Sequence, residues 1–274
     1  TFFLEGANMF DFATQSNAGG GFGGFVGGPG QDNSLLPFFS RTVGLDANGS
    51  PQRIDYGLKL FGQVGRQDIG VLHVRSAEEA GAAGVPAENV TVLRVKRRVL
   101  RQSYVGGMFT RRDSAGSASS ALGTMGLDFV LATSEFRGSK NLSTSGFLLR
   151  TTNPRDTGKN AAFGIRMDYP NDRWNGGVSY RAIQDNFNPA LGFLLRGGIQ
   201  RFNPYVNFSP RPRNHPFIRR LGFTANVDVQ TDMQNRALTR TLDFTAVSVE
   251  THRQDNFNFH VLPQYERLDR SFPI

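Results

Sequence analysis

The sequence predicts an all-β chain whose antiparallel strands run up and down, as the hairpins of a transmembrane β-barrel do. Three observations predict this fold class: an amphipathic hairpin over residues 160–183, an alternation of short turns with longer loops, and roughly twelve segments with strand patterning. The barrel is expected to be incomplete in this chain, with hairpins that continue beyond its C-terminus. Residues 1–55 form an entry segment in this division, and residues 56–274 form the hairpins.

Composition limits the classes of partner and chemistry. The 274 residues include no cysteine, which excludes a disulfide framework and thiolate metal sites, and no cofactor or metal is expected. The net charge of +8 comes mostly from arginines spread along the chain. With no basic helix and no aromatic RNA-binding motif, that spread argues against nucleic acid. Anionic lipid headgroups and anionic polysaccharide remain open as partners.

Hydropathy and the two ends of the chain bear on the membrane question. No run of eighteen apolar residues occurs, so no transmembrane helix is expected. The mean hydropathy of −0.35 is compatible with strands that are apolar at alternate positions only. The chain starts at Thr1 without an initiator methionine or signal peptide, and it ends at Ile274 without a terminal aromatic residue. These ends predict an internal piece of a longer protein.

The entry segment is glycine-rich. Residues 1–11 are expected to be a short helix or an extended segment. Residues 19–30 contain Gly19-x-Gly21-x-x-Gly24, but no strand precedes this spacing and no helix follows, which favours a loop or plug-like excursion over phosphate binding. Residues 35–44 are a possible first strand. Residues 46–49 are expected to be a turn, since the distal glutamate of a calcium loop is missing.

A regular series of expected hairpins begins at Tyr56. The expected strands are residues 58–64, 69–76, 90–98, 103–111, 122–134 and 142–152. Short connections such as Gly65-Arg-Gln-Asp68 alternate with long polar ones such as residues 77–89 and 112–121. An outer-membrane barrel has short periplasmic turns and longer outer loops, whereas a soluble sandwich has no reason to separate loop lengths by parity. The alternation therefore favours the membrane.

The hairpin over residues 160–183 is the clearest element. Pairing across the turn at residues 170–173 sets Tyr169 opposite Trp174, Ile165 opposite Val178 and Phe163 opposite Tyr180 on an apolar face. The reverse face carries Arg166 and Asp168. The predicted orientation places residues 170–173 in the periplasm. Tyr169, Trp174 and Tyr180 are expected at a membrane interface, although phenylalanine outnumbers the other aromatic residues.

The remaining third of the chain has a less regular strand pattern. Residues 191–208 form one long strand or two short ones divided at Asn203-Pro204, and the three prolines of residues 210–216 mark a break. Residues 221–229 and 238–249 alternate and pair with Ala225 opposite Phe244. Further pairs in the same register are Phe223 with Ala246, Val227 with Leu242, Thr224 with Thr245 and Asn226 with Asp243. A last strand over about residues 256–265 completes the count.

Several stretches together resemble a known family. They are Phe2-Phe-Leu-Glu-Gly6, Pro37-Phe-Phe-Ser-Arg41, Gly65-Arg-Gln-Asp-Ile-Gly-Val-Leu72, Val92-Leu-Arg-Val-Lys-Arg97 and Asn188-Pro-Ala-Leu-Gly-Phe193. In this order they resemble the domain of unknown function 5916, a family of expected outer-membrane barrels that often carry a carbohydrate-binding family 9-like domain ahead of the barrel. The resemblance implies missing N- and C-terminal parts and a location in the bacterial outer membrane. It implies no reaction.

The charged face of the predicted strands carries the functional hypothesis. The expected lumen-facing residues are Lys59, His73, Arg75, Arg94, Lys96, Arg98, Arg111, Arg150, Arg166 and Arg181, with Asp128, Asp168, Asp228 and Asp243. Such a set selects charged solutes in a pore, or it forms a structural ladder of ion pairs that fills a narrow barrel. The apolar neighbours of Arg94, Lys96 and Arg98 do not show on which face of the strand these three side chains lie.

Catalytic chemistry has little support in the sequence. The four histidines lack the HExxH spacing of a metal site, no Gly-x-Ser-x-Gly motif occurs, and the serine-rich residues 114–120 are better explained as an exposed loop. His252, near Glu250 and Asp255, is a candidate for a catalytic set only if other strands complete it. The expected function is binding or passage of a polar or saccharide-derived solute. The alternatives are a barrel anchor for a carbohydrate-binding domain and an integral outer-membrane hydrolase. Expected partners are outer-membrane lipid, the barrel-assembly machinery and a polar or anionic glycan.

Overall fold

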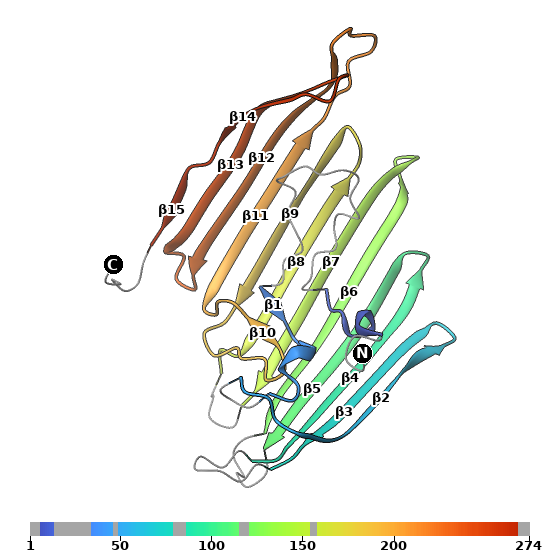
Figure 1. Ribbon diagram of the computed structural model, residues 1–274, viewed down its shortest axis with the longest axis vertical. Helices are drawn as coiled ribbons and strands as arrows, with labels where there is room; N and C mark the ends of the chain where they lie inside the picture. The colour runs from blue at the N-terminus through green and yellow to red at the C-terminus, as the bar shows by residue number, and fades with distance from the viewer. Residues whose placement is uncertain are drawn as a thin grey trace.

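The computed structural model describes residues 6–13, 34–45, 49–78, 86–114, 121–153 and 158–267, which form an all-β structure (Figure 1). The short 3-10 helices are η1 (Ala7–Phe10) and η2 (Ser40–Thr42), and the strands are β1 (Leu35–Leu36), β2 (Ile54–Val64), β3 (Gln67–Ser76), β4 (Glu88–Leu100), β5 (Ser103–Ser114), β6 (Leu122–Phe136), β7 (Lys140–Thr152), β8 (Ala161–Pro170), β9 (Trp174–Ile183), β10 (Phe193–Leu194), β11 (Ile199–Phe208), β12 (Ile218–Asp232), β13 (Ala237–Thr251), β14 (Asn256–Val261) and β15 (Gln264–Glu266). No helix of the described chain has the length and apolar character needed to cross a membrane.

Thirteen strands form one antiparallel sheet of up-and-down topology. Its order is β14-β13-β12-β11-β9-β8-β7-β6-β5-β4-β3-β2, with β15 paired to β13 beside β14. Each long strand pairs with the next one along the chain, because most connections are too short to carry a crossover. Within the described residues β2 and β14 do not pair with each other, so the sheet has two open edges. The antiparallel, up-and-down arrangement confirms that part of the predicted fold class, whereas the described residues do not form a closed barrel.

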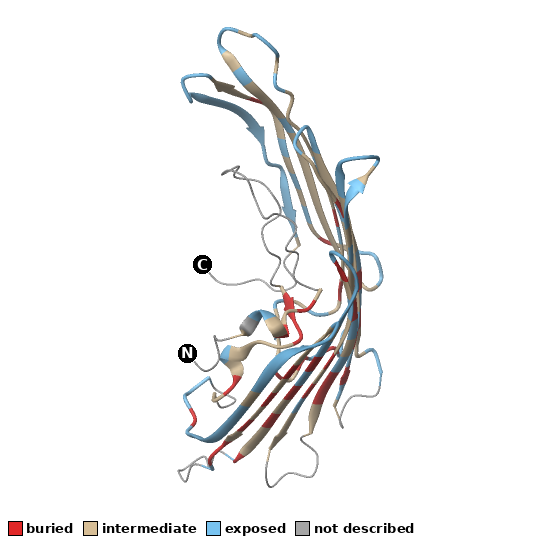
Figure 2. Cartoon of the chain, turned by 90° about the vertical axis from the view of Figure 1, so that its right-hand side faces the viewer, coloured by how far each residue is buried: buried red, intermediate tan, exposed pale blue. Residues whose placement is uncertain are grey.

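The sheet is curved, and the N-terminal segment lies in its hollow (Figure 2). This segment, residues 6–13 and 34–45, is held there partly by a small second sheet in which β1 pairs with β10. Its apolar side chains join a core with residues of the long strands, among them Phe10, Phe12, Leu72, Val92 and Leu149. The buried core therefore lies between the segment and the concave face of β3–β7, and it extends to Ala162 of β8 and Ile183 of β9. The rest of β8–β14 has few buried apolar side chains among the described residues.

Connection lengths follow the predicted parity over most of the sheet. At one end the connections are residues 65–66, 101–102, 137–139 and 171–173, and at the other they are residues 77–87, 115–121, 153–160 and 184–198. Gly65 has a φ of 60°, which suits the two-residue turn between β2 and β3. The parity is lost at residues 209–217 and 233–236, where the longer connection lies at the short-turn end.

The register of β8 and β9 differs from the predicted one by two residues. Ile165 pairs with Tyr180, Phe163 with Ala182 and Met167 with Val178. The prediction failed because it closed the hairpin at Tyr169, whereas β8 continues to Pro170, which pairs with Asn175. A shift of two residues leaves every side chain on its predicted face, because strand side chains alternate with a period of two.

The register of β12 and β13 is confirmed over its central part. Thr224 pairs with Thr245, Ala225 with Phe244, Asn226 with Asp243 and Val227 with Leu242. The predicted pair of Phe223 with Ala246 is wrong, because a register shift lies between Gly222 and Thr224. A β-bulge of this kind adds one residue to one strand, and that is why a strict alternation in sequence did not reveal it.

Three other boundaries differ from the predictions. The possible first strand over residues 35–44 is only the two residues of β1, followed by η2, and the last strand is divided into β14 and β15 around Pro263. Asn203-Pro204 lies inside β11 and does not divide it. The ladder to β12 skips both residues. The Asn203 side chain donates to the Val227 carbonyl at 2.7 Å, where Pro204 offers no N–H. The glycine-rich residues 19–30, the predicted turn at 46–48 and residues 115–120 lie outside the described residues.

Candidate functional site

The two faces of the sheet differ in chemistry. On the convex face of β4–β13, the charged side chains of the described residues lie within four positions of a strand end, as Arg97, Arg111, Arg150 and Arg240 do, and the middle of the face carries none. Large apolar side chains there are exposed, including Leu127 at 66%, Ile165 at 56% and Leu148 at 54%. The other exposed convex residues of this kind include Leu60, Leu93, Val95, Val105, Met125, Leu131, Phe163, Met167, Val178, Phe202, Val206, Leu242 and Phe244. An exposed apolar face of this extent is unusual for a soluble monomer and is typical of a surface that contacts another protein or a membrane.

Aromatic residues form a row along the short-turn end of the convex face. Trp174 stacks on Phe208 with ring centroids 4.3 Å apart, Phe208 lies 6.0 Å from Phe223, and Tyr169 contacts Phe136 edge-on at 6.4 Å. Two of the three predicted interface aromatics, Tyr169 and Trp174, thus lie at the same level. Tyr180 lies on the same face six residues further along β9, or about 20 Å from Trp174 at the usual rise per residue.

The concave face carries most of the predicted charged set. The contacts with the N-terminal segment identify this face, because Arg94 and Lys96 both donate to carbonyls of that segment. Register then assigns to the same face Lys59, Arg94, Lys96, Arg98, Asp128, Arg166, Asp168, Arg181, Asp228 and Asp243. The open phase of Arg94, Lys96 and Arg98 is resolved in favour of the concave face.

Four of the predicted lumen residues lie on the convex face instead. Arg75 pairs with Tyr56, and His73 with Leu58, on the face opposite Lys59. Arg111 pairs with Thr91 beside Leu93, and Arg150 pairs with Met125. The facing prediction was wrong here because β3 and β7 are apolar on both faces. The N-terminal segment covers the concave face of these strands, which therefore carries Leu72, Val74 and Leu149 where a solvated face would be polar.

Arg94 and Asp128 form a buried ion pair under the N-terminal segment. Both side chains are 0% exposed, and the two guanidinium nitrogens donate to the two carboxylate oxygens at 2.6 and 2.7 Å. Arg94 also donates to the Asp11 carbonyl and lies over the Phe12 ring, with 4.9 Å from its guanidinium carbon to the ring centroid. Asp128 accepts further hydrogen bonds from the Ala13 N–H and the Tyr104 hydroxyl. This pair is therefore part of the attachment of the N-terminal segment to the sheet.

The Asp11 carboxyl lies beside this pair. Burial raises the pKa of Asp11, while the nearby Lys96 and Arg94 charges act in the opposite direction. The concave surface under the segment is thus closely neutralised, with its cations and carboxylates already engaged with one another. This half of the concave face acts as a packed interior that anchors the segment.

The other half of the concave face, from β8 to β14, carries ion pairs that are more open to solvent. Arg166 donates to Asp168 at 2.6 Å, Arg201 forms a two-pronged pair with Asp228 at 2.8 Å, and His260 contacts Asp243 at 2.7 Å. These contacts fit the structural-ladder alternative, because Arg166, Arg201 and His260 each face a carboxylate. They also form a continuous polar surface along the face.

Sequence reasoning missed three residues of this surface. Asn203 donates to Asn226, the Tyr205 hydroxyl donates to Asp168 at 3.1 Å, and Arg201 pairs with Asp228. All three lie in β11, for which the sequence allowed either one long strand or two short strands divided at the proline. The signal that could have found them is the alternation of polar and apolar residues from Ile199 to Phe208, with Arg201, Asn203, Tyr205 and Asn207 on one face.

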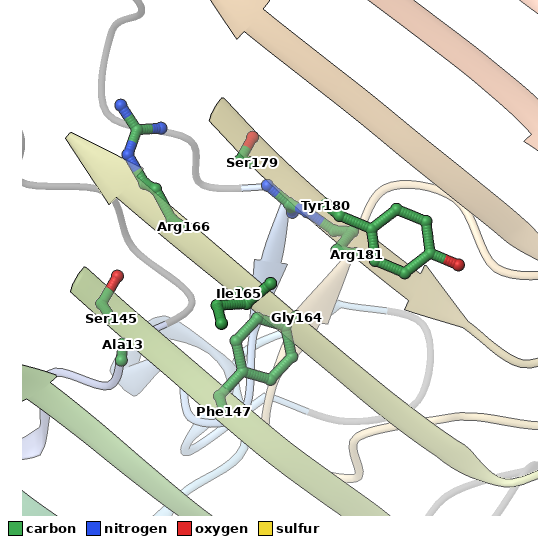
Figure 3. A pocket seen from close by; sticks show the side chains of 9 residues that line it. All are labelled: Ala13, Ser145, Phe147, Gly164, Ile165, Arg166, Ser179, Tyr180 and Arg181. Carbon is green, nitrogen blue, oxygen red and sulfur yellow. The ribbon is translucent and has the colours of Figure 1, made fainter. Parts of the chain in front are cut away.

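A shallow recess lies between the two halves of the concave face (Figure 3). Its lining includes Ser145 of β7, Arg166 of β8, and Ser179 and Arg181 of β9. Arg166 Nη2 is buried and has no hydrogen-bond partner in the described chain. Arg181 donates to the Ser34 hydroxyl of the N-terminal segment at 2.7 Å. Two guanidinium groups and two hydroxyls match the acceptor oxygens of a polyhydroxylated or anionic solute.

The candidate catalytic set around His252 is not assembled in the described residues. His252 Nε2 lies 3.0 Å from the His215 carbonyl oxygen, whereas Glu250 pairs with Arg219 and Arg220. Asp255 is engaged by the Thr251 hydroxyl at 3.2 Å. Within the described ranges no group of three His, Asp or Glu side chains is placed to hold a metal ion.

No family model, curated protein or solved structure matches the chain. The resemblance to the domain of unknown function 5916 therefore stays a prediction.

Proposed function

We propose that this sheet is part of a transmembrane β-barrel of the bacterial outer membrane, with its convex face against lipid and its concave face lining the interior. The single observation that carries this proposal is the convex band, the middle of the convex face of β4–β13, which is apolar, exposed and free of charged side chains among the described residues. Such a band, bordered by aromatic residues, matches the lipid-facing surface of barrels. The two open edges of the sheet would pair with each other or with further strands.

Matched charge substitutions on the two faces test the membrane assignment. Ile165→Arg puts a charge in the middle of the convex band and should destabilise the folded chain in lipid vesicles by about 2–4 kcal/mol. Thr241→Arg puts the same charge on the concave face, where Thr241 pairs with Asp228, and should have little effect. Urea-dependent folding of the full chain in phosphatidylcholine vesicles gives both values. Equal effects of the two substitutions would contradict the assigned facing.

We further propose that the concave recess binds or passes a polar, anionic or saccharide-derived solute. Support comes from the convergence of Arg166, Arg181, Ser145 and Ser179, and from the unpartnered Arg166 Nη2. Basic side chains along the wall of a pore favour anions over cations. In planar bilayers the chain should pass anions in preference to cations, and Arg166→Glu should reduce or reverse that preference. Absence of conductance in both proteins would contradict passage and leave only binding.

A further inference from the structure

Four arginines lie in one row on the convex face at the long-loop end. Arg75, Arg111 and Arg150 lie close to that end of β3, β5 and β7, and Arg240 lies near the same end of β13. Register fixes their facing: each pairs across the sheet with a convex residue, Arg75 with Tyr56, Arg111 with Thr91, Arg150 with Met125 and Arg240 with Val229. Just below this row begins the apolar band.

The row runs at the angle expected for a membrane plane. The register leads from Arg75 across β4 to Asp113 on β5, which lies two residues from Arg111. It leads from Arg111 across β6 to Thr152 on β7, which lies two residues from Arg150. Each step therefore spans two strands sideways and two residues along the strand. At about 4.8 Å per strand and about 3.3 Å per residue, Arg75, Arg111 and Arg150 follow one another at about 12 Å on a line tilted by about 35°. Arg240 lies five strands beyond Arg150, at least about 24 Å away. Barrel strands tilt by a similar angle to the barrel axis.

Three of the four arginines in this row are not neutralised by described residues of the protein. Arg75, Arg150 and Arg240 form no ion pair in the described chain, and Arg150 and Arg240 are exposed. Arg111 pairs with Asp113 at 2.7 Å, and both side chains are exposed. Among the ion pairs of the described residues, this is the one contact between the row and a carboxylate. Four guanidinium groups thus face one carboxylate. Arg94, Arg166 and Arg201 on the concave face show the opposite pattern, because each of them pairs with an aspartate.

We propose that the row of Arg75, Arg111, Arg150 and Arg240 binds the phosphate groups of anionic lipids in the leaflet at the long-loop end. The inference rests on the proposed function, since it requires the apolar band to lie in a bilayer. A guanidinium at the border of an apolar band reaches the headgroup layer, and its planar fork fits phosphate oxygens in two-pronged geometry. The row gives the barrel a charged border on that side and an aromatic border on the other.

Native mass spectrometry of the full chain extracted from mixed vesicles tests this inference. The vesicles contain phosphatidylcholine and phosphatidylglycerol in equal amounts, and the readout is the ratio of the two lipids retained by the protein. The wild-type chain should retain phosphatidylglycerol in preference. Replacement of Arg75, Arg150 and Arg240 by Gln should reduce that preference about fivefold per residue removed.

The matched control replaces three exposed arginines of the short-turn end, Arg101, Arg213 and Arg253, by Gln, which changes net charge equally. This control should retain the wild-type preference. A protein that inserts in both vesicle types but shows no preference, or loses it equally in both variants, would overturn the arginine row and leave the barrel proposal standing. A chain that fails to insert in any vesicle would overturn both.

Discussion

Removing the carboxylate of Asp128 should be among the most costly single changes in this protein. Asp128→Ala leaves the guanidinium of Arg94, which is 0% exposed, without its charged partner, and it removes acceptors from the Tyr104 hydroxyl and the Ala13 N–H. Breaking a buried ion pair by removing one partner costs about 3–5 kcal/mol. The loss should be concentrated in the attachment of residues 6–13, because the pair bonds both Asp11 and Ala13.

Two further variants make the expected value specific to burial. Asp172→Ala removes an equally well-formed two-pronged pair with Arg211, but these side chains are 71% and 58% exposed, so the cost should stay within about 1 kcal/mol. The double variant Arg94→Met with Asp128→Leu replaces the buried charges by apolar groups and should recover much of the loss.

The assay is urea unfolding of the full chain in detergent, followed by the fluorescence of Trp174, the one tryptophan of the chain. Hydrogen exchange of residues 6–13 in the same samples should show that Asp128→Ala loosens the N-terminal segment before the sheet unfolds. If Asp128→Ala cost no more than Asp172→Ala, the pair would not anchor the segment, and the reasoning from burial would be refuted.

Three further changes probe other contacts. Gly126→Val should destabilise the chain by about 1–3 kcal/mol, since a Cβ there meets Leu149 and Phe12, and proteolysis should then cut residues 6–13 faster; unchanged cleavage would show that the segment is not packed against β6. Asn203→Leu should cost about 1–3 kcal/mol in urea unfolding, because it leaves the Val227 carbonyl without its donor next to Pro204; a neutral result would show that water replaces the side chain. Phe208→Ala should cost about 0.5–1.5 kcal/mol beyond the lost apolar contact, through its stacking on Trp174, and a Trp174 emission spectrum that did not change would contradict that contact.

The sequence predicted the faces of hairpins wherever one face is polar. In β8 and β9 all the facing assignments hold although the register is off by two residues, because Arg166 and Asp168 alternate with Ile165 and Met167. In β12 and β13 the central register holds as well. The bulge near Gly222 was not predictable, because an inserted residue does not alter the local alternation on either side of it.

The errors cluster where both faces of the sheet are apolar. The assignment of Arg75 and Arg150 to the interior would place Leu72 and Leu149 on the outer face, whereas both leucines lie in the buried core. The sequence could not show that the N-terminal segment covers the concave face of β3–β7, since that contact joins residues more than fifty positions apart. The same long-range contact determines the role of Arg94, whose partners Asp11 and Asp128 are far from it in sequence.

The most direct test of the central claim is spin-label accessibility along β8 and β9 in phosphatidylcholine vesicles. The chain has no cysteine, so single cysteines can be placed in the native background at Phe163, Ile165 and Met167 on the convex face, and at Ser179 and the neighbouring Ser145 of β7 on the concave face. The barrel proposal predicts that the first three labels collide with oxygen dissolved in lipid and the last two with a water-soluble nickel complex. Equal access of the nickel complex to both sets would contradict it.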